Sequence, residues 1–157
     1  NEVAREQILA RVLKPVLDEY DVVLIDCQPS LGLLTVNALT AAHGVLIPLE
    51  TEYFALRGVA LLIDTVEKVR ERLNSAIRVD GIVATMYDPR TLHSREVMER
   101  VVETFGDTVL DTVIGRTVKF PDASVAAVPI TEFAPSHSSA QTYRQLAREL
   151  VARGAIA

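Results

Sequence analysis

The chain has 157 residues, of which 49% are hydrophobic, so it is long enough for one domain with a real core and too apolar for a disordered tail. Its formal net charge of −5 excludes a general attraction to nucleic acid, so any DNA contact must come from a local basic patch. The single cysteine, Cys27, excludes an internal disulfide. With no signal peptide and no apolar run of roughly 18 residues, we expect a cytoplasmic protein without a transmembrane helix, built as one domain over residues 1–157.

Hydrophobic periodicity divides the chain into alternating helices and strands. An amphipathic helix is expected over 1–19, kinked or broken at Pro15, and a buried strand over 20–26, where Val22 to Ile25 run without a polar break. The other expected helical segments are 31–42, 53–74, 94–105, 122–127 and 138–153, and the other apolar strand segments are 44–49, 79–86, 109–114 and a brief run at 127–130. This alternation indicates βαβ units and a mainly parallel sheet.

Capping residues mark the ends of two of these helices. Ser94 is the expected N-cap of the helix over 94–105, and Gly106 is its expected stop. For the last helix, Ser138 or Ser139 is the expected N-cap and Gly154 the expected stop.

The candidate site lies where the first expected strand ends. Asp26 closes the apolar run, and the turn-forming residues Pro29, Ser30 and Gly32 follow. Ligands of open α/β sheets bind outside the carboxyl ends of the strands, so a carboxylate there, beside a loop that can move, suits a metal-bound phosphate. The pattern alone is equally consistent with an aspartate that only begins a turn.

This stretch resembles the second nucleotide-sensing loop of the ParA/MinD family, the deviant-Walker ATPases that position chromosomes, plasmids and division sites. The matching residues are Asp26-Cys27-Gln28-Pro29-Ser30-Leu31-Gly32, followed by Leu34-Thr35-Val36-Asn37-Ala38-Leu39, without a gap. The resemblance implies that Asp26 takes part in catalysis and holds Mg²⁺ through water. It also implies that Pro29 and Gly32 belong to a loop that senses the γ-phosphate of ATP.

Further segments extend the resemblance over about residues 20–150. Residues 52–58 resemble the family segment that opens a long helix near the nucleotide and the dimer face. Residues 85–91 and 112–120 resemble the two family segments that border adenine, although Gly115 and Thr117 replace the family's Pro and Asn. The resemblance implies nucleotide contacts for Met86, Tyr87, Gly115 and Arg116. For Met86, simple packing in the core is the alternative.

The resemblance also names partners. In several ParA relatives, basic residues at the positions of Arg90 and Lys119 bind DNA without sequence preference, and phosphate contact is chemistry that both side chains perform well. The implied partners are non-specific DNA, a second copy of the chain in an ATP-bound homodimer, and a ParB-type centromere-binding protein. No membrane partner is implied, and the expected location is cytoplasmic and nucleoid-associated.

One feature of phosphate-binding α/β proteins is missing from this sequence. None of its seven glycines forms Gly-x-x-x-x-Gly-Lys-Ser/Thr or Gly-x-Gly-x-x-Gly, the loops that cradle phosphates. In the ParA/MinD family that loop lies upstream of the region matched here. The expected fold is therefore a three-layer, P-loop NTPase-like (Rossmann-like), mainly parallel sheet with helices on both faces, without the N-terminal strands and the phosphate loop.

Three functions remain open at this point. The resemblance favours the C-terminal portion of a ParA/Soj-type partition ATPase, inactive as the 157-residue chain alone. The alternative is a non-enzymatic interaction module that binds no nucleotide. The third possibility is a different P-loop relative, either a cobyrinate-type amidotransferase or a nitrogenase-iron-protein-like reductase, because these also place an aspartate at the end of a strand. The reductase needs a cluster-ligating cysteine pair, and only Cys27 is present.

Overall fold

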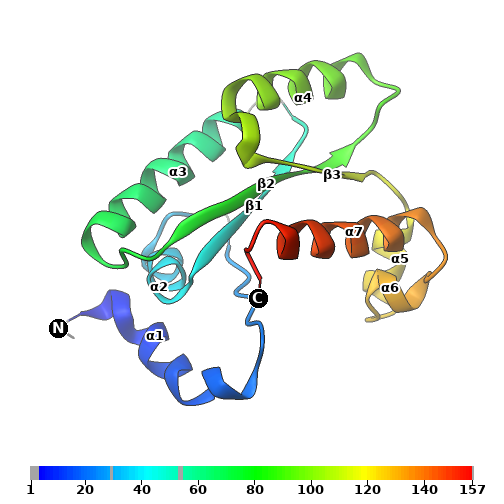
Figure 1. The fold of residues 1–157 in the computed structure, drawn as a ribbon. Helices are drawn as coiled ribbons and strands as arrows, with labels where there is room; N and C mark the ends of the chain where they lie inside the picture. The colour runs from blue at the N-terminus through cyan, green and yellow to red at the C-terminus, as the bar shows by residue number, and fades with distance from the viewer. Residues whose placement is uncertain (1–3, 29, 53–54, 157) are drawn as a thin grey trace.

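The computed structural model describes residues 4–28, 30–52 and 55–156, and Figure 1 shows their arrangement. The α-helices are α1 (Ile8–Leu13), α2 (Leu33–Ala41), α3 (Ala55–Arg72), α4 (Leu92–Phe105), α5 (Lys119–Val125), α6 (Ile130–Phe133) and α7 (Ser138–Ala152). The strands are β1 (Gly44–Glu50), β2 (Arg78–Tyr87) and β3 (Val109–Gly115), and short 3₁₀ helices cover Arg5–Gln7, Lys14–Glu19 and Gly106–Thr108.

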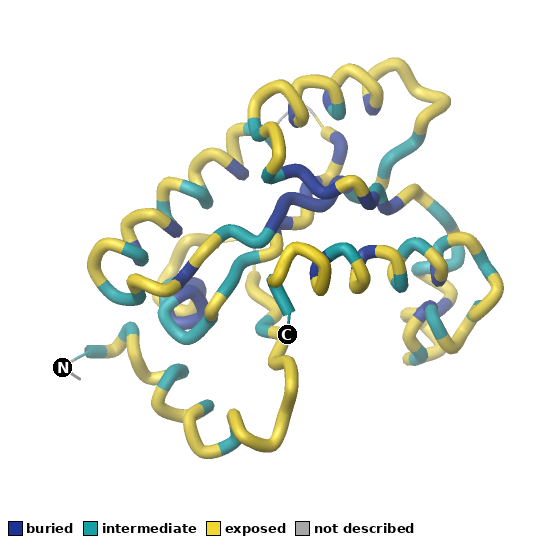
Figure 2. Tube along the Cα trace, in the orientation of Figure 1, coloured by how far each residue is buried: buried dark blue, intermediate teal, exposed yellow. Residues whose placement is uncertain are grey.

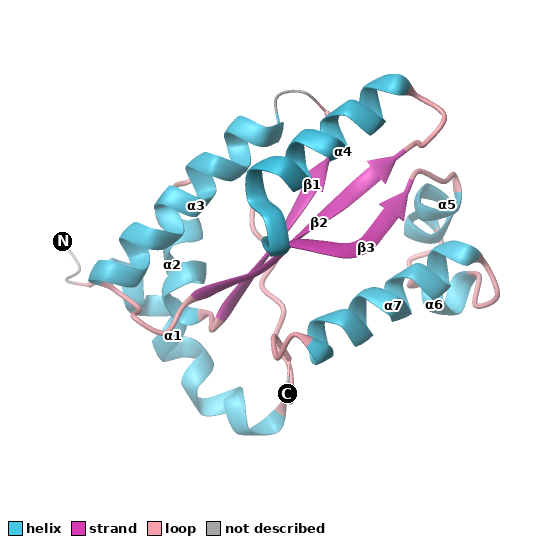
Figure 3. Cartoon of the chain, turned by 45° about the horizontal axis from the view of Figure 1, so that its top comes forward, coloured by secondary structure: helices cyan, strands magenta, loops and turns pink. Residues whose placement is uncertain are grey.

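The three strands form one parallel sheet in the order β1-β2-β3. The β1–β2 pairing runs from Gly44 opposite Arg78 to Glu50 opposite Thr85. Helix α3 connects β1 to β2, and α4 connects β2 to β3. Because right-handed crossovers that proceed in one direction place their helices on the same face, α3 and α4 lie together on one side of the sheet and α7 lies on the other (Figures 1 and 3).

Each face of the sheet has its own hydrophobic core, and the buried residues follow the central strand in Figure 2. Neighbouring residues of β2 point to opposite faces, so Ile82 and Val83 belong to different cores. The core under α3 and α4 contains Ile47, Leu49, Val59, Ile82, Val97, Val101 and Val109. The core under α7 contains Val83, Leu110, Ile114, Leu146 and Leu150. The expected parallel sheet with helices on both faces is thus confirmed.

Most of the expected elements are found within a few residues of their predicted bounds. The expected break of the first helix at Pro15 is confirmed, since 3₁₀ geometry begins at Lys14. Gly106 and Gly154 adopt positive φ angles of 51° and 70°, as glycine stops do. The N-caps are different residues from those predicted: Thr91 and His137 accept hydrogen bonds from the backbone N–H groups of Ser94 and Ser139 at 3.3 and 3.2 Å.

The strand predicted over 20–26 is wrong, because this segment forms neither a strand nor a helix. Val22, Val23 and Leu24 are exposed, Leu24 at 89%. A β-strand needs a neighbour for its backbone N–H and C=O groups, and no strand among the described residues lies beside this segment. An apolar run is therefore not sufficient for a strand where the hydrogen-bond partner is missing.

The predictions around 122–130 also need correction. Helix α5 begins at Lys119 rather than at residue 122, because the Thr117 hydroxyl accepts a hydrogen bond from the Lys119 backbone N–H at 3.2 Å and turns the chain there. The apolar run at 127–130 forms no strand. Ala127 is left-handed, with a φ of 53°, and Ile130 begins α6 with its side chain buried.

The outer edge of β3 is covered by two side chains of α7. The Glu149 carboxylate accepts hydrogen bonds from the backbone N–H groups of Asp111 and Thr112 at 2.8 and 2.9 Å. The Arg153 guanidinium donates to the carbonyl of Val109 at 3.1 Å and pairs with Glu149 at 3.0 Å. The β2–β3 pairing shifts in register here, so the backbone groups that β2 does not use are satisfied by α7.

We predict that Glu149→Gln destabilises the fold in a pH-dependent way. Burial alone raises the pKa of the Glu149 carboxyl, but the Thr112 side chain, the two N–H groups and the Arg153 charge outweigh burial and lower the pKa below its usual value. Because the pKa of Glu149 is lower in the folded than in the unfolded state, its ionised carboxylate stabilises the fold. This stabilisation is fully present above the unfolded-state pKa and is lost as pH falls through the folded-state pKa. At pH 7 the loss should be about 1–3 kcal/mol, and the wild-type advantage should shrink at acid pH.

Urea unfolding of both proteins between pH 7 and pH 3 measures this difference. Glu71→Gln, at an exposed position of α3, is the matched control and should change stability little at any pH. A Glu149→Gln penalty that stays constant over this range would contradict the assigned role of the carboxylate charge.

We predict that Gly81→Ala destabilises the sheet. A Cβ atom on Gly81 would lie 2.5 Å from Leu110 Cδ2 and 2.9 Å from its Cγ, and Leu110 is buried. Overpacking of this kind costs about 1–3 kcal/mol. Gly58→Ala is the control: a Cβ there meets no atom within 4 Å, and alanine in a helix should stabilise by up to about 1 kcal/mol. Thermal unfolding of both variants separates the two effects.

Candidate functional site

The carboxyl ends of the three strands meet at one edge of the sheet, where backbone hydrogen bonds join the loops that follow them. Thr51, directly after β1, donates from its backbone N–H to the Thr85 carbonyl at 3.3 Å. Arg116, directly after β3, donates from its backbone N–H to the Tyr87 carbonyl at 3.0 Å. This edge is where parallel sheets bind ligands.

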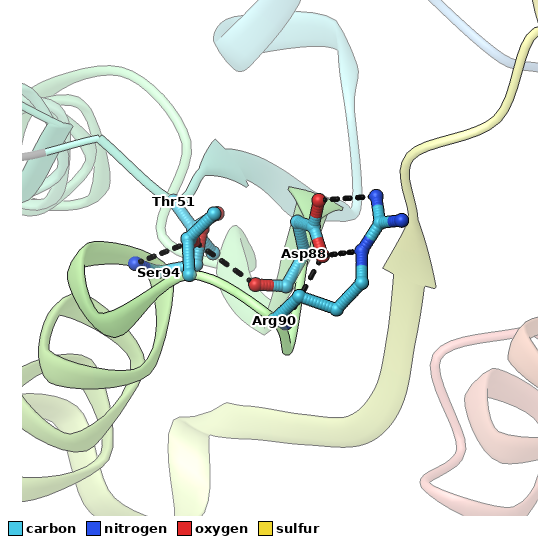
Figure 4. A network of polar contacts seen from close by, with 5 residues as sticks. Thr51, Asp88, Arg90 and Ser94 are labelled. Carbon is cyan, nitrogen blue, oxygen red and sulfur yellow. Dashed lines mark hydrogen bonds and ion pairs between the residues drawn. The ribbon is translucent and has the colours of Figure 1, made fainter.

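A polar network ties the end of β1 to the start of α4, as Figure 4 shows. The hydroxyl of Thr51 contacts that of Ser94 at 3.4 Å, and both side chains are buried. The Ser94 backbone N–H bonds the Thr91 hydroxyl, which in turn donates to the Asp88 carbonyl at 3.1 Å. The network therefore fixes the loop between β2 and α4 against the end of β1.

Asp88 and Arg90 form a two-point ion pair at this edge (Figure 4). The guanidinium donates from Nε to Oδ1 at 2.9 Å and from Nη2 to Oδ2 at 2.7 Å, and the Arg90 backbone N–H also donates to Oδ1 at 3.0 Å. These bonds, with a smaller contribution from the charge of Arg116, lower the pKa of Asp88 to about 2. Asp88 is thus ionised at any physiological pH.

Four predicted nucleotide contacts lie together at the ends of β2 and β3. Tyr87 pairs with Gly115, and Arg116 follows. Met86 has a φ angle of 55°, which is uncommon for a residue with a side chain, and it is 41% exposed. Met86 is therefore not a core residue in this structure. A Cβ on Gly115 would lie 3.7 Å from the Tyr87 carbonyl oxygen, so the backbone does not demand glycine there.

The remaining predicted site residues lie in the segment before α2. Asp26 and Gly32 are exposed, and Pro29 lies outside the described residues. Among the hydrogen bonds and ion pairs of the described ranges, none joins Asp26 or Gly32 to the loops after β2 and β3. Partial burial and the adjacent Asp26 charge raise the pKa of the Cys27 thiol, so the thiol stays protonated at neutral pH.

The two predicted DNA-contacting residues follow the ends of β2 and β3. Arg90 is 86% exposed although it pairs with Asp88. Lys119 begins α5, and its Nζ lies 3.8 Å from Oδ2 of Asp122 in a looser pair between half-exposed side chains. The sequence prediction included neither of these aspartates, although Asp88 stands two residues before Arg90, a spacing that is typical of local side-chain-to-backbone turns.

The donor set fits a Mg²⁺-nucleotide only in part. No group of three or more His, Cys, Asp or Glu side chains is gathered within 4–28, 30–52 and 55–156. Mg²⁺ keeps several waters and needs only one or two carboxylates beside the substrate phosphates, and the exposed Asp26 can supply one. Met86 offers apolar surface to a base, but these residues include no Gly-rich loop for the phosphates. None of the described helices has the length and apolar character to cross a bilayer.

Comparisons with known proteins agree with this geometry. Residues 1–79 match the family described as AAA domain. The chain is 66% identical over 153 residues to an uncharacterized Mycobacterium tuberculosis protein, covering 98% of this chain and 48% of that protein. It is 48% identical over 153 residues to the chromosome-partitioning ATPase Soj of Treponema pallidum, covering 98% of this chain and 60% of Soj.

Among solved structures, the cobyrinic acid a,c-diamide synthase of Mycobacterium smegmatis with bound ADP and magnesium superimposes with a TM-score of 0.79 at 37% identity. That match covers 96% of this chain and 54% of the synthase chain, so the fold of this chain recurs in a nucleotide-binding protein. The chain spans about half the length of the curated relatives it matches. On this homology, the chain belongs to the ParA/Soj family of ParA/MinD-type ATPases.

Proposed function

We propose that this chain serves a chromosome or plasmid partitioning ATPase that dimerises on Mg-ATP, binds DNA without sequence preference and hydrolyses ATP when a ParB-type partner stimulates it. The 48% identity to Soj of Treponema pallidum over 153 residues carries this proposal. In the cell, such a protein would be cytoplasmic and associated with the nucleoid.

Within this function, the ends of β2 and β3 would border the adenine base. The apolar surface of Met86 and the main chain of Tyr87 and Gly115 suit a flat aromatic ring, and Arg116 lies beside them. The shared edge supports this role because the backbone bond from Arg116 to Tyr87 keeps the two loops together.

The segment before α2 would act on the phosphates. Asp26 would hold Mg²⁺ through a water molecule, and the loop that contains Pro29 and Gly32 would order around the γ-phosphate. The exposure of the Asp26 side chain supports this role, since an outer-sphere metal ligand must be open to water.

Arg90 and Lys119 would contact DNA phosphates. Arg90 lies in the loop after β2 and Lys119 begins α5 after β3, and both side chains are at least 43% exposed. With a net charge of −5, the chain depends on such local residues for any attraction to DNA. A homodimer doubles the number of these cations on one DNA segment.

Two other functions are outcomes of the same experiments. A non-enzymatic interaction module would bind neither Mg-ATP nor DNA. An amidotransferase is favoured by the 37% identity to cobyrinic acid a,c-diamide synthase, and activity on a cobyrinic acid substrate with no DNA binding would support it.

We predict that Asp26→Ala slows ATP hydrolysis by the natural polypeptide that carries this chain. Loss of an outer-shell metal partner typically lowers activity by roughly 10–100-fold. Hydrolysis is measured as phosphate release at saturating Mg²⁺, and Mg-ATP binding is measured by calorimetry. Asp21→Ala, in the same exposed segment, is the control and should retain wild-type activity. Equal rates for Asp26→Ala and wild type would remove Asp26 from the catalytic site.

We predict that Arg90→Ala combined with Lys119→Ala weakens binding of the ATP-bound protein to a random-sequence DNA duplex. The plot of log affinity against log salt concentration should become shallower by about one for each lost phosphate contact. Arg72→Ala is the control for the loss of one positive charge, because Arg72 is exposed at the end of α3 and hence at the opposite end of the sheet. Unchanged affinity and slope in the double variant would refute the assigned DNA surface.

A further inference from the structure

Each of the two basic side chains assigned to DNA faces a carboxylate that is close to it in sequence. Arg90 pairs with Asp88, two residues before it, and Lys119 pairs with Asp122, three residues after it. The two pairs differ in geometry: the closest N–O distance is 2.7 Å in the first and 3.8 Å in the second. Only the first pair is a two-point contact.

The Asp88 carboxylate binds the Arg90 guanidinium in the same two-point geometry that a phosphate would use. Nε and Nη2 form one edge with two parallel N–H donors, which is the geometry by which arginine binds carboxylates and phosphates alike. Both donors of this edge point at the Asp88 oxygens (Figure 4). A DNA phosphate can take the same edge only after Asp88 has left it.

Asp88 itself is fixed in the loop independently of the Arg90 side chain. Its carboxylate also accepts the Arg90 backbone N–H, and its carbonyl accepts the backbone N–H of Thr91 at 3.1 Å. The Asp88 side chain is 19% exposed, whereas the Arg90 side chain is 86% exposed. The pair therefore opens by rotation of Arg90 into solvent, while the carboxylate stays in place.

We propose that Asp88 is an intramolecular competitor of DNA: its carboxylate occupies the arginine edge that a phosphate would take, and so keeps the affinity of the Arg90 contact low. This inference rests on the proposed DNA-binding function of Arg90. The low pKa of Asp88 keeps the carboxylate ionised, so the competition is constant at physiological pH. Rapid release from DNA is the physical result, because every phosphate contact at Arg90 is weakened by an internal alternative.

The test compares Asp88→Asn with Asp122→Asn in the natural polypeptide, with Mg-ATP and a random-sequence duplex. Both variants remove one negative charge beside a basic residue, but only Asp88→Asn frees a two-point pair. We expect Asp88→Asn to raise affinity by about two- to fivefold and to steepen the salt dependence by about one. Asp122→Asn should have a clearly smaller effect. In an Arg90→Ala background, Asp88→Asn should change affinity no more than Asp122→Asn does.

Three results would overturn the proposal. Equal gains from Asp88→Asn and Asp122→Asn would mean that net charge alone acts. Weaker DNA binding by Asp88→Asn would mean that Asp88 positions Arg90 for DNA instead of competing. A full gain in the Arg90→Ala background would mean that Asp88 acts through another residue, such as Arg116.

A second measurement does not depend on DNA. Phenylglyoxal modifies unpaired guanidinium groups, and peptide mass spectrometry reports the rate at each arginine. Arg90 should react several-fold faster in Asp88→Asn than in wild type, with Arg72 as the internal reference. Equal rates would show that the pair does not mask Arg90. A third outcome is possible: Arg90 reacts faster in Asp88→Asn, but Arg90→Ala leaves DNA affinity unchanged. Asp88 would then mask Arg90 as proposed, but Arg90 would not bind DNA.

Discussion

Backbone hydrogen bonds hold β2 between β1 and β3 in parallel register, and they bring three separate loops to one edge of the sheet. Parallel strands start at one edge and end at the other, so residues 51, 88 and 116, far apart in sequence, become neighbours. The bonds from Thr51 to Thr85 and from Arg116 to Tyr87 extend the pairing past the strands themselves. The candidate base surface and the candidate DNA surface are both consequences of this arrangement.

The β3 and β1 sides of the sheet differ in how well other elements cover them. On β3, Glu149 and Arg153 of α7 bind the free backbone groups, which protects this edge from pairing with another chain. On β1, the residues that point away from α3 and α4 are exposed, Leu46 at 37% among them. Within the described residues, α7 thus covers the β3 edge, whereas the face of β1 opposite α3 and α4 is open to solvent.

Sequence periodicity was sufficient for the elements that pair or pack within the described residues. Helix α3 was predictable because its apolar residues recur at helical spacing, and β2 because both of its faces are buried. Periodicity failed at Val22 to Ile25, because a strand depends on a neighbour that the local sequence does not encode. The N-caps at Thr91 and His137 were missed because the residue that accepts the capping hydrogen bond depends on where the first turn of the helix begins.

The candidate site divides in the same way. The resemblance indicated Met86, Tyr87, Gly115 and Arg116, and the structure places them at adjoining strand ends, while their contacts with a nucleotide remain predictions. It did not indicate Thr51 or Ser94, because the contact between them joins two elements that are 43 residues apart in sequence. A local motif cannot report such pairs.

The left-handed backbone at Met86 limits how this position can change during evolution. With a φ angle of 55°, a β-branched residue such as Val, Ile or Thr would clash with its own backbone, so these replacements are strongly disfavoured. Glycine and asparagine adopt this conformation easily but offer little apolar surface. A lineage that keeps both the turn and an apolar side chain at the end of β2 is thus restricted to residues that are not branched at Cβ, and methionine is the most adaptable of them.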